Sequence, residues 1–245
     1  MKRYLYNQFN KAASDPYFLK QIQKPKYSTI KFFDFLKKNN CLNSSIMDCA
    51  CGNGANLIYL KKKYKYSYPL LGIDINKILV KKSKNYIKNY KGIRIEKGNI
   101  FNINKKYIKK FNGIISIATL SWLDDYEKAV KQMIKLKPKF IAITALFWEG
   151  LIDFKIRLNY LKNKSFKRKI NSFTYYNIYS LKNYIDLLKK NGFKKNIATK
   201  FKIPKQIHQK NKIRMGTYTI KHGNELIQIS GPIKMNWYYI LSKKS

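Results

Sequence analysis

The stretch Ile46-Met47-Asp48-Cys49-Ala50-Cys51-Gly52-Asn53-Gly54 places an apolar pair, an acidic residue and two glycines in direct succession. A strand that ends in an acid and continues through a Gly-x-Gly turn brings backbone amides close to a ligand above the carboxyl edge of a parallel sheet. A predicted helix over 55–62 completes the pattern. Since glycine-rich turns also form ordinary corners between strands and helices, the stretch predicts a ligand site only together with other signals.

A second acidic residue supplies the first of these signals. Asp74 ends the next predicted strand, 70–74, one strand-helix-strand unit after Asp48. A carboxylate at this point can accept hydrogen bonds from both hydroxyls of a ribose. The structural alternative is a cap for the following helix, predicted over 77–90. The pairing of the two acids favours the ribose role.

The spacing of the glycines indicates which nucleoside ligand to expect. A nicotinamide dinucleotide site normally has a third glycine, and Leu57 occupies that position here. A phosphate-binding loop with Gly-Lys-Ser/Thr is also missing after Gly54. We therefore expect a nucleoside ligand without a phosphate chain.

Short apolar runs alternate with amphipathic stretches through the first two thirds of the chain, which predicts strand-helix repeats and a parallel sheet. The expected fold is α/β and doubly wound, with a mainly parallel seven-stranded sheet, an antiparallel C-terminal edge and an N-terminal helical cap. The predicted later elements are strands over 93–96, 113–117, 140–144, 217–220 and 237–241, and helices over 126–135 and 181–190. We place the last two strands on the edge of the sheet.

The chain is expected to form one domain over residues 1–245. Residues 1–40 read as a helical cap or lid, with breaks at Asp15-Pro16 and Lys24-Pro25. Residues 41–245 form the core, with an insertion on the acceptor side near 150–180.

These residues resemble the class I S-adenosylmethionine-dependent methyltransferases, a Rossmann-like family, over roughly residues 30–245. The stretch 46–54 resembles the first motif of the family, 72–75 the second, 98–100 the third and 111–123 the fourth. The sequence departs from the family at Ala50, where glycine is usual, and at Asn99, where an acid is common. The resemblance implies S-adenosyl-L-methionine as cofactor, held by Asp48, Ala50, Cys51, Gly52, Gly54, Asp74, Ile75, Asn99, Ile100 and Ala118.

The acceptor is less clearly indicated. Family members that methylate amino groups of bases usually carry an Asn/Asp-Pro-Pro-Tyr/Phe motif after the fourth strand, and here the chain reads Ala118-Thr119-Leu120-Ser121-Trp122. Acids and aromatics after the fourth and fifth strands, Trp122 and 147–153, suit a polar cyclic acceptor, but core packing explains the aromatics equally well. We expect O-methylation of a small molecule or glycan precursor, with a hydroxyl as the favoured acceptor group.

A hydroxyl acceptor requires a general base, whereas in-line attack on a sulfonium otherwise depends mainly on alignment. The weak candidates for this catalytic role are Glu149, Asp153 and His208. Asp124 and Asp125 favour a helix N-cap over a metal site, and no metal is expected.

The chain of 245 residues carries a formal net charge of +40, which suggests a polyanionic partner. Nearly all of the cations are lysines spread along the whole sequence, so codon bias is the favoured explanation and nucleic acid is not favoured as a partner. No apolar run reaches the length of a membrane span, and the three cysteines do not form a disulfide framework. We expect a cytoplasmic enzyme, with two alternatives, an RNA methyltransferase and a non-catalytic nucleoside-binding or scaffold protein of the same fold.

Overall fold

A computed structural model describes residues 16–159, 173–208 and 216–244. Its central sheet has the strand order β3-β2-β1-β4-β5-β13-β9, and a two-residue strand, β8, pairs with the end of β5. Strands β1 to β5 are parallel, whereas β13 runs antiparallel to both β5 and β9. The expected mainly parallel, seven-stranded sheet with an antiparallel C-terminal edge is confirmed. The strands are β1 (Ile46–Cys49), β2 (Leu70–Asp74), β3 (Ile93–Lys97), β4 (Gly113–Ile117), β5 (Phe140–Trp148), β8 (Tyr179–Ser180), β9 (Lys195–Lys200) and β13 (Trp237–Lys243).

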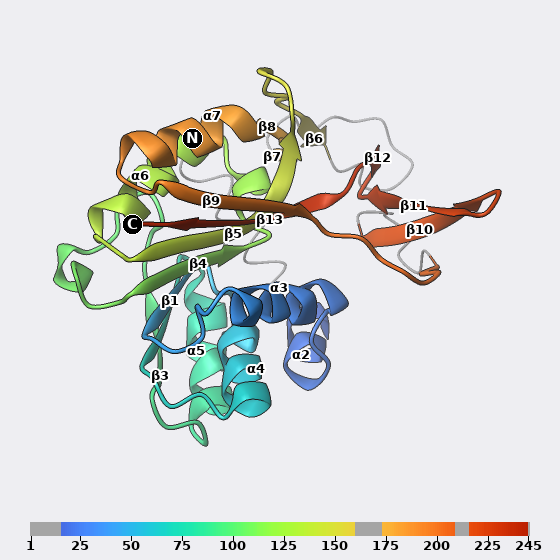
Figure 1. The fold of residues 1–245 in the computed structure, drawn as a ribbon. Helices are drawn as coiled ribbons and strands as arrows, with labels where there is room; N and C mark the ends of the chain where they lie inside the picture. The colour runs from blue at the N-terminus through green and yellow to red at the C-terminus, as the bar shows by residue number, and fades with distance from the viewer. Residues whose placement is uncertain (1–15, 160–172, 209–215, 245) are drawn as a thin grey trace.

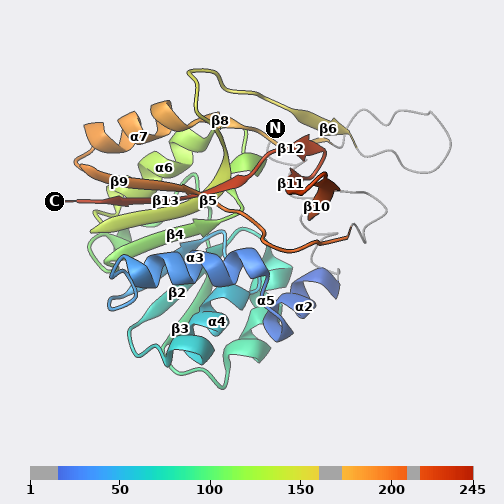
Figure 2. The same cartoon turned by 45° about the vertical axis from the view of Figure 1, so that its right-hand side comes forward.

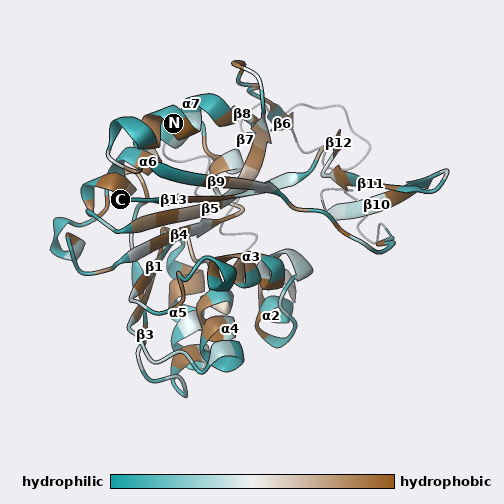
Figure 3. Cartoon of the chain, viewed as in Figure 1, coloured by the Kyte–Doolittle hydropathy of each residue, from teal (hydrophilic) through white to brown (hydrophobic). Residues whose placement is uncertain are grey.

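Helices cover both faces of this sheet (Figure 1). One face packs against α3, α4 and α5 through residues such as Phe32 and Leu57, and the other packs against α6 and α7 through residues such as Met133 and Leu188. Figure 3 shows the apolar interior strands between the polar outer surfaces of the helices. The helices are α3 (Tyr27–Lys38), α4 (Ala55–Tyr64), α5 (Lys77–Ile87), α6 (Tyr126–Lys135) and α7 (Leu181–Lys190), with short 3-10 turns η1 (Lys105–Tyr107) and η2 (Leu120–Trp122).

Polar side chains begin three of these helices. Asn76 Oδ1 accepts from the backbone N–H groups of Ile78 and Leu79, at the start of α5. Asp125 Oδ1 accepts from the Lys128 N–H and caps α6, as the sequence predicts. Ser180 Oγ does the same for α7. Such caps satisfy N–H groups that have no partner within the helix, so they set where each helix starts.

The N-terminal part begins, for the described residues, with α2 (Pro16–Gln23), followed by α3. The two predicted breaks fall at the start of α2 and between the two helices, because proline cannot continue a helix past its first turn. Residues 1–15 of the expected cap lie outside the described residues. The expectation that the chain is one domain stays a prediction.

The C-terminal third differs from the sequence prediction in one respect. Strand β10 (Thr217–His222) does not lie on the edge of the central sheet; it pairs with β11 (Glu225–Ser230), which pairs with β12 (Ile233–Lys234), in a separate antiparallel sheet. The real edge is β9, which was not predicted because its alternating pattern has few large apolar residues. Figure 2 shows the small sheet beyond the carboxyl ends of the central strands.

The expected insertion near 150–180 contains a two-stranded hairpin, β6 (Arg157–Asn159) and β7 (Phe173–Tyr175). Residues 160–172, within this insertion, lie outside the described residues. No helix in the described ranges is long and apolar enough to cross a membrane.

Gly113 opens β4 directly beneath the ring of Phe140. A Cβ at this position would lie 2.1 Å from Phe140 Cζ and 2.6 Å from its Cε1. Because the ring is 5% exposed and closely packed, Gly113→Ala is expected to lower the free energy of unfolding by about 2–3 kcal/mol. Urea denaturation measures this change. The matched control is Gly216→Ala, where a Cβ meets nothing within 4 Å; an equal loss in both variants would contradict the steric explanation.

Candidate functional site

The loop after β1 has an unusual backbone. Ala50, Gly52 and Gly54 have φ angles of 66°, 59° and 83°, in the left-handed region. Glycine adopts this region freely, but alanine pays about 1–2 kcal/mol for it. Ala50, which stands where the family usually has glycine, therefore carries backbone strain.

Hydrogen bonds hold this loop against the end of β2. The backbone N–H groups of Ala50 and Cys51 donate to the carbonyl of Ile73 at 2.8 and 3.0 Å. The side chain of Cys51 packs over Gly72, where a Cβ would come within 2.5 Å of its sulfur. The close packing of Cys51 therefore explains why position 72 is a glycine. The place of Gly72 in the second motif did not indicate this.

The carboxylate of Asp74 joins two loops. Its Oδ2 accepts from the Gly52 N–H and its Oδ1 from the Asn76 N–H, both at 2.8 Å. Burial raises the pKa of Asp74, while these two hydrogen bonds lower it. A carboxylate has about four acceptor positions, so two are left for a ligand at the 9% of the residue that is exposed.

Asp48 is fully buried, one residue before the end of β1. Its Oδ2 accepts from Asn56 Nδ2 at 3.3 Å, and its Oδ1 has no hydrogen-bond partner. Burial, which outweighs the hydrogen bond from Asn56 and acts together with the nearby charge of Asp74, raises the pKa of Asp48 to about 7. An unpaired carboxylate oxygen in the interior is costly, which points to a ligand group as its missing partner.

The next strand ends place the remaining predicted residues at the same edge. Ile75, just after β2, is 40% exposed, and Ile100 is buried. Asn99 is exposed, and its Oδ1 accepts from the Phe101 N–H at 2.9 Å, which forms a turn after β3. Asn99 is therefore already engaged in its own turn.

Strand β4 ends at Ala118, which also has a positive φ, of 53°. The Ala118 N–H donates to the carbonyl and to the Oγ1 of Thr144 on β5, at 3.1 and 2.8 Å. Ser116 Oγ donates to the Cys49 carbonyl at 2.9 Å and joins β4 to β1. Thr144 and Ser116 were missed by the sequence analysis because a buried hydroxyl within an apolar strand carries no pattern of its own.

These residues lie where the strand order reverses, between β1 and β4. At such a point the connections leave in opposite directions and open a crevice for a ligand. Helix α2 covers part of this region: Asn53 Nδ2 donates to the Phe18 carbonyl at 2.6 Å, and a Cβ at Gly52 would lie 3.2 Å from the Phe18 ring.

The three candidate catalytic residues are not brought together. Glu149 accepts from the Tyr238 hydroxyl at 2.5 Å and pairs with Lys200 at 2.6 Å, and these two contacts lower its pKa. Asp153 Oδ1 accepts from the Ser180 N–H at 2.7 Å. His208 is exposed on the irregular stretch after β9. Each acid thus has a structural partner.

The aromatic residues after β4 and β5 divide into two groups. Phe147 is 1% exposed and belongs to the core, as the packing alternative proposed. Trp122 packs on Tyr176, with ring centroids 4.9 Å apart. Trp148 is 45% exposed and contacts Phe154 edge to face. Phe147 and Trp122 thus form a packed group, and Trp148, at the end of β5, is exposed to solvent.

The cysteine thiols and metal ligands give no further site. Cys41, Cys49 and Cys51 are buried free thiols, and burial raises the pKa of each. Within the described residues, no group of three His, Cys, Asp or Glu side chains is placed to hold a metal ion.

Comparisons with known proteins agree with this geometry. The family model described as "Methyltransferase domain" matches residues 42–241. A curated relative, a malonyl-[acyl-carrier protein] O-methyltransferase from Calditerrivibrio nitroreducens, is 26% identical over 162 residues, which cover 63% of this chain and 61% of the relative. The chain therefore aligns with about three fifths of that relative's length.

Solved structures share the fold at low identity. Magnesium protoporphyrin IX methyltransferase (ChlM) from Synechocystis PCC 6803, with bound SAH, has a TM-score of 0.60 and 10% identity, with 100% of each chain covered. The N-terminal domain of EvdMO1, in the presence of SAH and D-fucose, has a TM-score of 0.58 and 7% identity, with 91% of this chain and 84% of that chain covered.

The raised pKa of Asp48 leads to a pH-dependent prediction. A carboxyl group that titrates at about 7 in the folded protein, against an ordinary 3.8, makes the folded state progressively less stable as the pH rises between these values. Asp48→Asn removes this cost. We therefore expect Asp48→Asn to raise the free energy of unfolding above that of the wild type by about 2 kcal/mol more at pH 8 than at pH 5.

Urea denaturation at the two pH values, without ligand, measures this difference. The control is Asp34→Asn, which alters an exposed carboxylate paired with Lys31 at 3.5 Å. A gain from Asp48→Asn that does not change with pH would show that Asp48 titrates normally.

Proposed function

This chain belongs to the methyltransferase domain family and uses S-adenosylmethionine, and we propose that it methylates an oxygen atom of a small molecule, a carboxylate in preference to a hydroxyl. The observation that carries this proposal is the state of Glu149 and Asp153. Each acid accepts a hydrogen bond in a structural contact, Asp153 from the Ser180 N–H and Glu149 from the Tyr238 hydroxyl. A carboxylate acceptor is already ionised near neutral pH, so it needs no base.

The curated relative supports the same chemistry. It is named as a malonyl-[acyl-carrier protein] O-methyltransferase, and a malonyl group ends in a free carboxylate. Bound S-adenosylmethionine supplies a methyl group on a positively charged sulfur. When bound, the cofactor would supply this methyl group to a carboxylate oxygen and leave as S-adenosylhomocysteine, so no proton would have to move. The protein must therefore hold the acceptor oxygen in line with the methyl carbon.

We propose distinct roles for the residues of the candidate site. Asp74, with its remaining acceptor positions, binds the ribose hydroxyls, and Ile75 packs against the adenine. The buried Oδ1 of Asp48 accepts from the amino-acid end of the cofactor, and the loop of Ala50, Cys51, Gly52 and Gly54 lies along it. Asn99, Ile100 and Ala118 border the cofactor on its other sides.

The fit rests on features present in this chain. The loop has the positive φ angles that let a backbone approach a ligand closely, and Asp48 has an orphaned oxygen beside it. Ala50 departs from the glycine of the family motif, but its φ angle is positive like those of Gly52 and Gly54. The non-catalytic scaffold alternative loses its basis, because the family match covers the core of the chain.

A sugar hydroxyl of a glycan precursor is the second candidate acceptor. It requires a base, and Glu149, Asp153 and His208 stay the candidates for that role. Of these, Glu149 would first have to leave Lys200 and Tyr238. Glu149→Gln should therefore leave turnover unchanged for a carboxylate acceptor and lower it for a hydroxyl.

Asp74→Ala tests the cofactor site. Loss of charge-assisted hydrogen bonds to two hydroxyls is expected to weaken S-adenosylmethionine binding by about 1.5–3 kcal/mol. Isothermal calorimetry measures the affinity, and thermal unfolding without cofactor checks that the loop still folds. Asp186→Ala, which removes an exposed carboxylate on α7, is the control. Unchanged affinity in Asp74→Ala would mean that the ribose binds elsewhere.

The acceptor proposal is tested with a matched pair of thioesters. We expect release of S-adenosylhomocysteine with malonyl-coenzyme A and at least ten times less with acetyl-coenzyme A, which lacks the free carboxylate. D-Fucose serves as the hydroxyl arm of the assay. Equal turnover with both thioesters, or turnover with the sugar alone, would exclude a carboxylate acceptor while leaving the cofactor assignment to the calorimetry.

A further inference from the structure

The amino-terminal edge of the central sheet lies opposite the candidate cofactor site. In the connecting segments at this edge, every charged residue is positive. The segments that enter the strands at this edge are 39–45, 65–69, 88–92, 108–112, 136–139 and 191–194, and residue 244 follows β13. None contains Asp or Glu, and their lysines are all exposed: Lys65, Lys88, Lys91, Lys109, Lys110, Lys137, Lys139, Lys194 and Lys244. We call this surface the amino edge.

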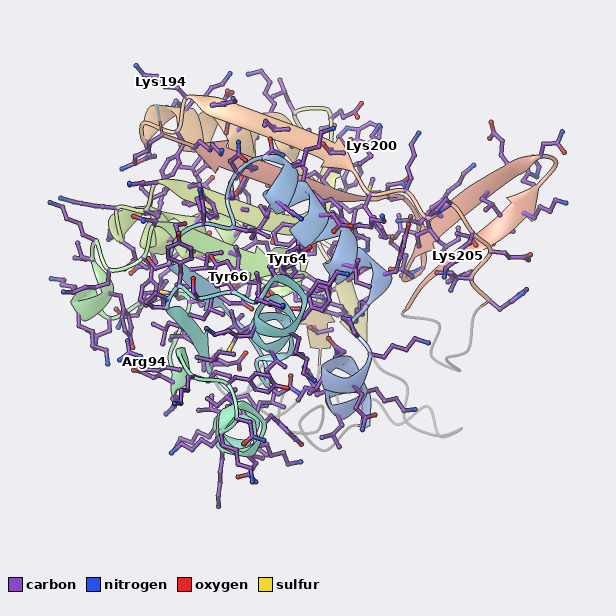
Figure 4. The ribbon with its side chains drawn as sticks, turned by 60° about the horizontal axis from the view of Figure 1, so that its bottom comes forward. Tyr64, Tyr66, Arg94, Lys194, Lys200 and Lys205 are labelled. Atoms are coloured by element: carbon purple, nitrogen blue, oxygen red, sulfur yellow. The ribbon has the colours of Figure 1, made fainter. Side chains whose placement is uncertain are left out.

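Four acids lie at the opposite edge, whereas Asp34 on α3 accepts a hydrogen bond from Tyr64 at the end of α4. Asp124, Asp125, Glu149 and Asp153 all follow the carboxyl ends of β4 and β5. Codon bias alone spreads lysines evenly, but it does not remove acids from one edge. Figure 4 shows Lys194 and Arg94 on the same side of the molecule, at the left of the view. Arg94 is an exposed residue near the start of β3.

Helix dipoles do not account for this separation. The negative end of each helix dipole favours lysine in the last turn, and the positive end favours acids in the first. Among α2 to α7, only α6 has an acid in its first turn. Lys65 and Lys88 are C-cap residues of α4 and α5, where the dipole does favour a cation, but Lys91, Lys139, Lys194 and Lys244 lie outside the helix ends.

A cavity of about 330 Å³ opens on the amino edge. It is lined by three lysines from two segments, Lys139, Lys243 and Lys244, and by the amides of Asn40 and Asn112. No ion pair of these lysines occurs within the described residues. Lys243 Nζ donates to the Asn39 carbonyl at 2.5 Å, which holds its ammonium at the cavity.

This lining fits a phosphate group. An ammonium group has three donors, and Lys243 directs two of them to the Asn39 carbonyl and the Cys41 thiol, so one stays available. The asparagine amides add neutral donors, and the lining contains no carboxylate that would repel an anion. Lysine binds phosphate as a point charge and needs no forked geometry.

Aromatic side chains stand beside the lysines on the same edge. In the segment after α4, Tyr68 is 42% exposed and its ring lies 5.7 Å from that of Tyr66. Lys62 lies over the ring of Tyr90, in the segment after α5, at 5.6 Å. Figure 4 shows Tyr66 and Tyr64 near the end of α4. Of these rings, that of Tyr68 is exposed and can stack with an unpaired base, whereas Tyr66 is 4% exposed.

From these observations we propose that the amino edge binds single-stranded RNA, with successive backbone phosphates held by Lys139, Lys243 and Lys244 at the cavity. The strand lies on the side of the sheet away from the candidate cofactor site. The RNA is therefore a bound partner of the enzyme and not its methyl acceptor.

The test is fluorescence anisotropy with a labelled single strand of about 20 nucleotides, at several salt concentrations. Three lost phosphate contacts reduce the slope of log K against log salt by about 2, and affinity at 0.1 M salt by about 100-fold. We expect these changes in the triple variant Lys139→Gln, Lys243→Gln, Lys244→Gln. The double variant that keeps Lys243 covers the case in which loss of its bond to Asn39 impairs folding.

The matched control is Lys81→Gln, Lys84→Gln, Lys128→Gln, which removes the same charge from exposed positions on α5 and α6. Its affinity should change less than threefold. Equal weakening in both triple variants would reduce the binding to net charge and overturn the proposal. Equal binding of poly-L-glutamate would indicate an acidic protein instead, and absence of RNA binding at 0.1 M salt would refute the site.

Discussion

The carboxylate of Asp74 is the interaction on which the site depends. By accepting from Gly52 and from Asn76, it links the loop after β1 to the start of α5. The Ile73 carbonyl, one residue earlier, receives the N–H groups of Ala50 and Cys51. Two adjacent residues of one strand therefore hold a loop whose backbone could not keep its left-handed angles unaided. The end of β2 thus fixes the conformation of the loop that follows β1.

The parts of the fold that were predictable carry strong local signals. Continuous apolar runs marked the buried strands, and prolines marked the ends of α2 and the start of α3. The spacing of Asp48, Gly52, Gly54 and Asp74 indicated the edge where these residues meet. Such signals arise from backbone rules and burial, which act within a few positions of the sequence.

The parts that were not predictable depend on distant contacts. Strand β9 lacks an apolar run because it pairs only with β13, at the edge of the sheet, and β10 left that sheet because β11 pairs with it completely. Glu149 looked like a free acid until Lys200 and Tyr238, more than fifty positions later, were seen beside it. The separation of charge between the two edges likewise emerges only when the connections are placed in space.

The contact between Phe18 and the Gly52 loop has a consequence for the order of folding. Helix α2 is made before its binding surface, since Asn53 and α4 follow it in the chain. An eight-residue helix is too short to persist alone in water. During synthesis, α2 can therefore become stable only after β1 and α4 have been made. It docks onto a loop that has already folded.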